Sequence, residues 1–264
     1  MESPSESAQV VWHAEQVGWL RLQRAPESRN VFDIARYPGA ICAWSLCQQG
    51  SQSNEIFLES NESSSIGAVI ARLQDLIVTS GHTSMLRVLH DPIRHSEHSD
   101  ALASFGIQYA FRTTLMLRDI LSMPMPSVDQ RIVAAETRRE YDAAISVMQE
   151  VFGGTRELTE FFNPFASAQL FVALTERGVA VSASAIWPCE KVAGLHNVAT
   201  LPLFRNRGHA HAVVIEALGF ARSSGFQYAG LRARAALVCC YECVGLEIAG
   251  YLDHYRYGLV VHEE

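Results

Sequence analysis

Hydrophobic and polar positions change their period several times along the second half of the chain. After Thr137, apolar residues recur at helical spacing, Glu140 completes a capping box with that threonine, and Gly153-Gly154 ends the pattern. Apolar, β-favouring runs at 168–175 and 179–187 flank a short glycine-containing turn and predict a hairpin. We also predict strands at 130–135, 192–200 and 228–231, helices at 209–224 and 235–244, and one or two closing strands within 246–261. This order is typical of a mixed α/β fold.

The first half repeats the end of that order in a weaker form. We predict helices at 66–79 and 100–105, each ending at a glycine, and strands at 85–89 and 111–118. The tetrapeptide Ser104-Phe105-Gly106-Ile107 corresponds in position to Cys243-Val244-Gly245-Leu246. This similarity indicates two copies of one fold, and two unrelated α/β segments are the alternative. The prolines of Met123-Pro124-Met125-Pro126-Ser127 place the boundary between domains 1–122 and 123–264.

Composition narrows the class of protein. The 264 residues are 48% hydrophobic and 19% charged, which predicts packed domains rather than disorder. The net charge of −7 does not favour binding to nucleic acid. It is compatible with a cationic acceptor, but a charge that simply keeps the protein soluble is the simpler interpretation. No apolar run approaches a membrane span, and the polar amino terminus lacks the features of a signal peptide.

Cysteines and histidines do not form a metal-ligand pattern. Cys240 and Cys243 give a single C-x-x-C without a second pair, so we interpret the six cysteines as small buried hydrophobes in a reducing compartment. We therefore expect a cytoplasmic protein. His95 and His98 are three residues apart, but no third ligand accompanies them, and we interpret their surroundings as a solvated loop.

The strongest chemical signal is the turn before the helix predicted at His209. Pro202 takes the chain out of the preceding strand, and the first helical turn presents N–H groups without internal partners. Gly208 permits close approach of a ligand, while Arg205 and Arg207 add two cations. These features predict a cradle for pyrophosphate. The sequence contains neither a P-loop nor a Rossmann glycine motif, so other nucleotide sites have no support.

These residues resemble the GNAT (GCN5-related N-acetyltransferase) superfamily. Arg205-x-x-Gly208-x-Ala210 is similar to its (Q/R)-x-x-G-x-(G/A) signature, and Thr200-x-Pro202-x-Phe204-Arg205 resembles the strand and turn before it. Tyr241-Glu242-Cys243-Val244-Gly245-Leu246 resembles the closing Y-E-x-x-G-F element. The resemblance covers about 130–257, roughly half of the chain. It implies a GNAT-like acyl-CoA N-acyltransferase fold with a mixed α/β sheet, in two tandem halves if the internal similarity is real.

The resemblance also implies roles for individual residues. Acetyl-CoA is the expected co-substrate, and the expected acceptor is an amine of a small molecule or peptide, attacked directly without a metal. Tyr241 would protonate the departing thiolate, and a core aromatic is its alternative role. The pantetheine arm would pair with the backbone of Val198, Ala199 and Thr200. The pyrophosphate would meet the segment Arg205, Asn206, Arg207, Gly208, His209 and Ala210. We expect no nucleic-acid or membrane partner, and a homodimer stays open.

The chain departs from the family pattern at two positions. Gly194 stands where many members carry a glutamate base; His196, on the same face of the strand, is a candidate replacement, although a structural histidine is the commoner case. Arg234 replaces a small polar residue and would either hold the 3′-phosphate or crowd the cofactor. The first half lacks the signature, so we expect it to have lost the cofactor and to shape the acceptor cleft. A non-catalytic acyl-CoA-binding or regulatory module, or a scaffold, is the alternative function.

Overall fold

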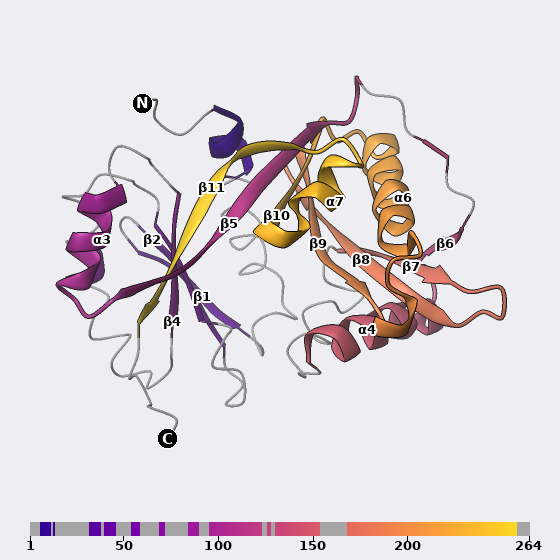
Figure 1. The fold of residues 1–264 in the computed structure, drawn as a ribbon, viewed down its shortest axis with the longest axis horizontal. Helices are drawn as coiled ribbons and strands as arrows, with labels where there is room; N and C mark the ends of the chain where they lie inside the picture. The colour runs from indigo at the N-terminus through magenta and orange to yellow at the C-terminus, as the bar shows by residue number, and fades with distance from the viewer. Residues whose placement is uncertain are drawn as a thin grey trace.

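The computed structural model describes the residues 6–11, 13, 32–37, 40–45, 54–58, 69–71, 84–89, 95–122, 126–127, 130–153 and 168–257. Their strands form one mixed sheet of eleven strands in the order β1-β2-β3-β4-β11-β5-β10-β9-β8-β7-β6 (Figure 1). In the first half the strands are β1 (Phe32–Tyr37), β2 (Ala40–Ser45), β3 (Asn54–Leu58), β4 (Ser84–Leu89) and β5 (Gln108–Asp119). In the second half they are β6 (Arg131–Ala134), β7 (Gln169–Leu174), β8 (Ala180–Cys189), β9 (Val192–Thr200), β10 (Tyr228–Arg234) and β11 (Glu247–Tyr257).

Two long helices cover opposite faces of the second half. In α4 (Arg138–Phe152) the predicted capping box is present: the Glu140 N–H donates to Thr137 Oγ1, and the Thr137 N–H donates to the Glu140 carboxylate. Its buried face packs on one side of β7, β8 and β9. Helix α6 (His209–Ser223) packs on the other side, with Val213, Val214 and Leu218 in the largest core cluster. The sheet is therefore the central layer of a three-layer unit.

Several predicted boundaries shift in the structure. The helix predicted at 100–105 is α3 (His95–Ala103), so His95 and His98 lie on a helix and their interpretation as loop residues was wrong. The helix predicted at 235–244 is a 3-10 turn, η3 (Ala235–Leu237), followed by the short α7 (Val238–Glu242). The helix predicted at 66–79 lies outside the described residues except at 69–71, which are helical.

The last strand of each half crosses into the sheet of the other half. Strand β5 lies between β10 and β11, and β11 lies between β5 and β4. In Figure 1 these two strands run side by side through the centre of the molecule. The two halves therefore share one continuous sheet, in which each half receives one strand from the other.

The turns into these two strands have the same hydrogen bonds. Gly106 donates to the Ala103 carbonyl and Ile107 to that of Leu102, just as Gly245 donates to Glu242 and Leu246 to Tyr241. The sequence spacing that relates Ile107 to Leu246 also relates Thr113 to Leu252, and these two residues pair with each other across β5 and β11. In two repeats related by a two-fold axis, a residue at the axis lies opposite its own counterpart, as Thr113 lies opposite Leu252. The pairing therefore supports the internal similarity seen in the sequence.

Candidate functional site

The parallel strands β9 and β10 separate after three residue pairs. Val192, Ala193 and Gly194 pair with residues 228–230, and pairing stops there although β9 continues to Thr200. From residue 195 on, the only strand that pairs with β9 among the described residues is β8, so the other edge of β9 has no strand partner there. An extended chain can add to such an edge as a further strand. The segment Val198 to Thr200, whose backbone was predicted to meet a pantetheine arm, lies on this unpaired edge.

A β-bulge bends β9 where the two strands separate. Asn197 has a positive φ of 50°, and the register with β8 shifts between Ala183 and Ala185. A bulge strengthens the local twist and changes the direction of the strand. Ser182 fixes the strand beyond the bulge, because its hydroxyl lies 2.7 Å from the Ala199 carbonyl oxygen and 2.8 Å from Thr200 Oγ1. The pattern of apolar residues did not predict this bulge.

The loop between β9 and α6 presents unpaired N–H groups. It begins with the 3-10 turn η2 (Pro202–Phe204) and ends at Gly208, the N-cap of α6, which has a left-handed φ of 79°. The first N–H bonded within α6 is that of Ala212, which donates to the Gly208 carbonyl. The N–H groups of residues 206–211 find no acceptor in the described part of the chain. Such a helix start is suited to an anion.

The two arginines of this loop are exposed. Arg205 donates from Nε to the Thr200 carbonyl at 3.2 Å, and the Arg207 guanidinium lies 5.7 Å from the centre of the Phe204 ring. Both side chains keep further guanidinium donors beyond these contacts. The cations and the unpaired N–H groups thus lie on the same loop, with Asn206 and Ala210 exposed beside them.

Gln130 holds this loop from outside it. Its amide nitrogen donates to the Arg207 carbonyl at 3.2 Å, and its amide oxygen lies 2.5 Å from His209 Nδ1, which makes that histidine nitrogen the donor. The imidazole of His209 is therefore turned toward Gln130, while its backbone N–H faces the open end of the helix. No local pattern indicates a role for Gln130, because its contact with His209 joins residues 79 apart in the chain.

Tyr241 lies on α7, which follows β10 after the 3-10 turn η3. The side chain is half-buried and packs against the core cluster that contains α6. Burial raises the pKa of its hydroxyl to about 12, with a smaller contribution from Cys240. The tyrosine therefore holds its proton at neutral pH. Its packing agrees with the structural alternative and leaves the acid role as a prediction.

The cysteines near Tyr241 are not buried. Cys239, Cys240 and Cys243 are exposed free thiols, whereas Cys189 is buried. The interpretation of all the cysteines as buried hydrophobes was therefore wrong for these three. Cys239 and Cys240 lie on the five-residue α7, which buries none of its residues completely, and Cys243 follows it as the C-cap. The described residues contain no group of three or more side chains suited to hold a metal ion.

His196 fills the space above Gly194. A Cβ atom built on Gly194 would lie 2.9 Å from His196 Nε2, so the imidazole occupies the position of a side chain there. The ring is half-buried and lies 5.2 Å from the Trp187 ring. Arg234 is exposed at the end of β10, and Val198 and Thr200 are half-buried on β9. The predicted residues thus gather around the open ends of β9 and β10.

Comparison with solved structures identifies this architecture. No family model and no curated protein matches the sequence. A GCN5-related N-acetyltransferase from Kribbella flavida is similar over 96% of this chain and 95% of its own, with a TM-score of 0.72 at 13% identity. One from Sphaerobacter thermophilus covers 84% of this chain and 78% of its own, with a TM-score of 0.61 at 15% identity.

A tandem GNAT protein from the clavulanic acid biosynthesis pathway, solved without AcCoA, gives a TM-score of 0.62 at 12% identity. The similarity covers 97% of this chain and 98% of that protein. The chain therefore has the GNAT fold, and a tandem member of that fold matches it over nearly its whole length. No helix in the described residues is long and apolar enough to cross a membrane.

Proposed function

We propose that the chain is an acetyl-CoA-dependent N-acetyltransferase whose second half binds the co-substrate. The observation that carries this proposal is the separation of β9 from β10 directly before a helix start with unpaired N–H groups. The unpaired edge of β9 at Val198, Ala199 and Thr200 fits an amide-containing arm, and the loop from Arg205 to Ala210 fits a diphosphate. The relatives in structure that carry the acetyltransferase name share this fold.

The residues of the site fit a direct transfer. An acceptor amine would attack the thioester carbonyl in the gap between the two strands, where unpaired N–H groups of β9 can stabilise the oxyanion. His196, on the face beside Gly194, would accept a proton from the amine. Tyr241, whose raised pKa keeps it protonated, would donate a proton to the leaving thiolate. The free thiols agree with a reducing compartment such as the cytoplasm.

The described residues of the first half do not show the same opening. Four of the five residues of β3 pair with β4, whereas β9 pairs with β10 over three of its nine residues. A closed pair of strands offers no edge to a pantetheine arm. We therefore assign the co-substrate to the second half and a supporting role to the first, with the boundary between them near Met123-Pro124.

Calorimetry with acetyl-CoA tests the binding step. Wild type should bind with a single site, and replacing Arg205 and Arg207 with Ala should weaken CoA by about tenfold while changing the affinity for pantetheine little. Arg177→Ala, in the exposed turn between β7 and β8, is the control and should bind like wild type. Equal losses for CoA and pantetheine would show that the two arginines do not contact the phosphates.

Turnover with Tyr241→Phe tests the chemical step. The variant should lose about a hundredfold or more in turnover and keep its affinity for acetyl-CoA, since only the proton donor is removed. Tyr228→Phe, whose hydroxyl accepts a hydrogen bond from Gln227 at the other end of β10, is the matched control. The absence of glutamate at position 194 favours one alternative, a non-catalytic acyl-CoA-binding module. That alternative gains if acetyl-CoA binds but no amine in a broad panel is acetylated.

A further inference from the structure

Three exposed thiols lie together on the short segment that carries Tyr241. Cys239 and Cys240 are on α7, Cys243 is its C-cap, and all three are exposed free cysteines. The Cys243 N–H donates to the Cys239 carbonyl oxygen at 3.1 Å, so residues 239–243 form one helical turn. None of the three side chains belongs to a core cluster of the described residues, and the proposed transfer does not use them.

Cys240 lies close to both of the other thiols. Its side chain is hydrogen-bonded to that of Cys239, and partial desolvation, followed by the thiols of Cys239 and Cys243, raises its pKa. Residues three apart on a helix have Cβ atoms about 5–6 Å apart, whereas a disulfide needs about 3.5–4.5 Å. Cys240 and Cys243 therefore need to approach by only about 1–2 Å to form a bond.

The pair Cys239 and Cys240 is less suited to a disulfide. A bond between sequence neighbours closes a small ring around the peptide group that joins them. That peptide is trans, and a planar trans peptide resists such a ring. The pair three residues apart is therefore the better candidate.

Helix α7 is able to change shape by the required amount. It has five residues, none of them completely buried, and it follows the equally short turn η3. A helix of this length has little stability of its own, because few hydrogen bonds offset the cost of ordering its first turn.

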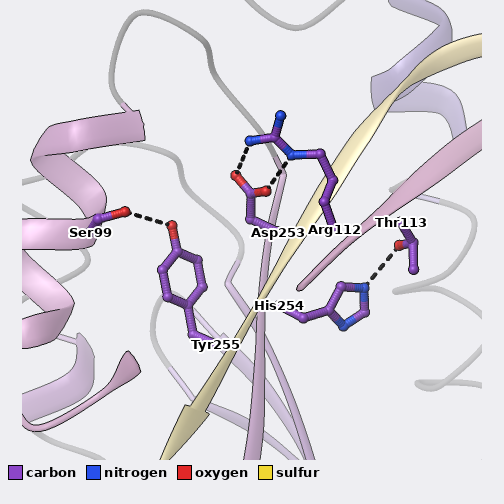
Figure 2. Close-up of polar contacts among 6 residues, drawn as sticks. All are labelled: Ser99, Arg112, Thr113, Asp253, His254 and Tyr255. Carbon is purple, nitrogen blue, oxygen red and sulfur yellow. Dashed lines mark hydrogen bonds and ion pairs between the residues drawn. The ribbon is translucent and has the colours of Figure 1, made fainter. Parts of the chain in front are cut away.

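The strands on either side of α7 are held too firmly to follow such a change. Every residue of β10 pairs with β5, while β11 pairs with β5 on one edge and with β4 on the other. Arg112 of β5 fastens β11 further, because its Nε lies 2.7 Å from Asp253 Oδ1 (Figure 2). Thr113 Oγ1 adds a contact of 2.9 Å with His254 Nε2, drawn in the same figure. A deformation of α7 therefore stays within residues 235–246.

Tyr241 lies between the two cysteines in the sequence and belongs to the part that deforms. Its carbonyl oxygen accepts hydrogen bonds from the N–H groups of Val244 and Leu246, both at 3.1 Å. Tightening residues 240–243 therefore shifts the backbone that carries the tyrosine. A catalytic group misplaced by about 1 Å loses about a hundredfold in rate.

We propose that Cys240 and Cys243 form a thiol-modification site, at which a low-molecular-weight disulfide oxidises the pair to an internal disulfide and stops acetyl transfer. The effect on transfer rests on the proposed function, whereas formation of the bond does not. In a reducing compartment such a bond is transient and acts as a redox sensor.

The oxidation proceeds in two exchange steps. The raised pKa makes Cys240 a poor first nucleophile, so Cys243 is assigned the first attack on a sulfur of the oxidant. This attack releases one small thiolate and leaves a mixed disulfide on Cys243. The thiolate of Cys240 then attacks the sulfur of Cys243 and releases the second small thiolate. Both protein sulfurs are oxidised, and the two sulfurs of the oxidant are reduced and take up the two protons.

Glutathione disulfide is the oxidant in the experiment that tests this site. The reduced full-length protein is incubated with it, remaining thiols are alkylated, and the peptides are mapped by mass spectrometry. Trypsin leaves 235–256 as one peptide, because this segment contains no Lys or Arg before its last residue. Cleavage after Glu242 then separates Cys240 from Cys243 unless a disulfide joins the two pieces. Turnover and acetyl-CoA affinity are measured on the same samples, before and after reduction with dithiothreitol.

In wild type the two pieces should stay joined, with one thiol left to alkylate, and turnover should fall by about tenfold or more until dithiothreitol restores it. The affinity for acetyl-CoA should stay near that of the reduced protein, because α7 lies outside β9 and the loop before α6. Cys243→Ser should form no such bond and keep its turnover in the oxidant. Cys239→Ser is the matched control and should behave like wild type, which also excludes a bond through Cys239.

Four results would overturn the inference: pieces that separate after cleavage, a stable glutathione adduct without an internal bond, an equal loss of turnover in Cys243→Ser, or full turnover in protein that carries the bond. A reduced protein that neither binds acetyl-CoA nor acetylates any amine would instead refute the proposed function. The mass of the joined pieces is read without any turnover, so the two failures are distinguishable.

Discussion

Gly208 offers the sharpest test of the loop geometry before α6. Its φ of 79° lies in the left-handed region, where a residue with a Cβ is less stable by about 1–2 kcal/mol. A Cβ at this position would also lie 3.2 Å from the Gln130 amide nitrogen, which donates to Arg207. Because that contact is with the end of a flexible side chain, it adds little. Gly208→Ala should therefore lower the free energy of unfolding by about 1–2 kcal/mol.

Gly219 in the same helix is the matched control with the opposite sign. A Cβ there would meet nothing within 4 Å, and alanine is favoured over glycine in a helix interior by about 1 kcal/mol. Urea unfolding of the two variants should place them on opposite sides of wild type. Calorimetry should show weaker acetyl-CoA binding for Gly208→Ala only, because its methyl group narrows the approach to the N–H groups. If both variants unfold like wild type, the left-handed N-cap is not a feature of the folded protein.

Three further outcomes follow from buried groups and from the shared sheet. In urea titrations, Tyr141→Phe should have the same free energy of unfolding as wild type or one about 1 kcal/mol higher, because the buried Tyr141 hydroxyl has no hydrogen-bond partner among the described residues. A free energy of unfolding lower than that of wild type by more than about 1 kcal/mol would contradict this. Because the folded pKa of His254 is about 2, below the unfolded value of about 6.5, stability is lost as pH falls below 6.5, by up to about 1.4 kcal/mol per pH unit. His254→Gln should flatten this slope between pH 6 and 4, and parallel curves for the two proteins would refute the shift. The segments 1–126 and 127–264 should each fail to unfold cooperatively alone and recover when co-expressed, as judged by circular dichroism.

Local patterns predicted most elements of the second half, although the helix predicted at 235–244 is η3 followed by the short α7. The capping box at Thr137 and the glycines after α6 and α7 act over four or five residues, so sequence alone locates these ends. The short strands β1, β2 and β3 were not predicted. Each has five or six residues, and an apolar run of that length does not distinguish a strand from a buried helical turn.

The candidate site was predictable where it depends on the backbone and not where it depends on distant contacts. The helix start at Gly208 and the separation of β9 from β10 follow from one stretch of chain and its resemblance to a known signature. The contacts of Gln130 with Arg207 and of Phe111 with His254 join residues far apart in sequence. Periodicity carries no information about which strands become neighbours, so these residues became visible only in the fold.

The exchange of β5 and β11 explains why a half without a cofactor signature still matters to the site. Every residue of β10, from Tyr228 to Arg234, pairs with β5. Strand β5 therefore holds in place the strand from which β9 separates. It also carries Phe111 and Thr113 to the face beside His196. Under the proposed function, the first half therefore supplies a wall of the co-substrate site through β5 without binding the co-substrate itself. Substitutions in β5 should accordingly change turnover at the proposed site, although the strand lies in the half to which we do not assign the co-substrate.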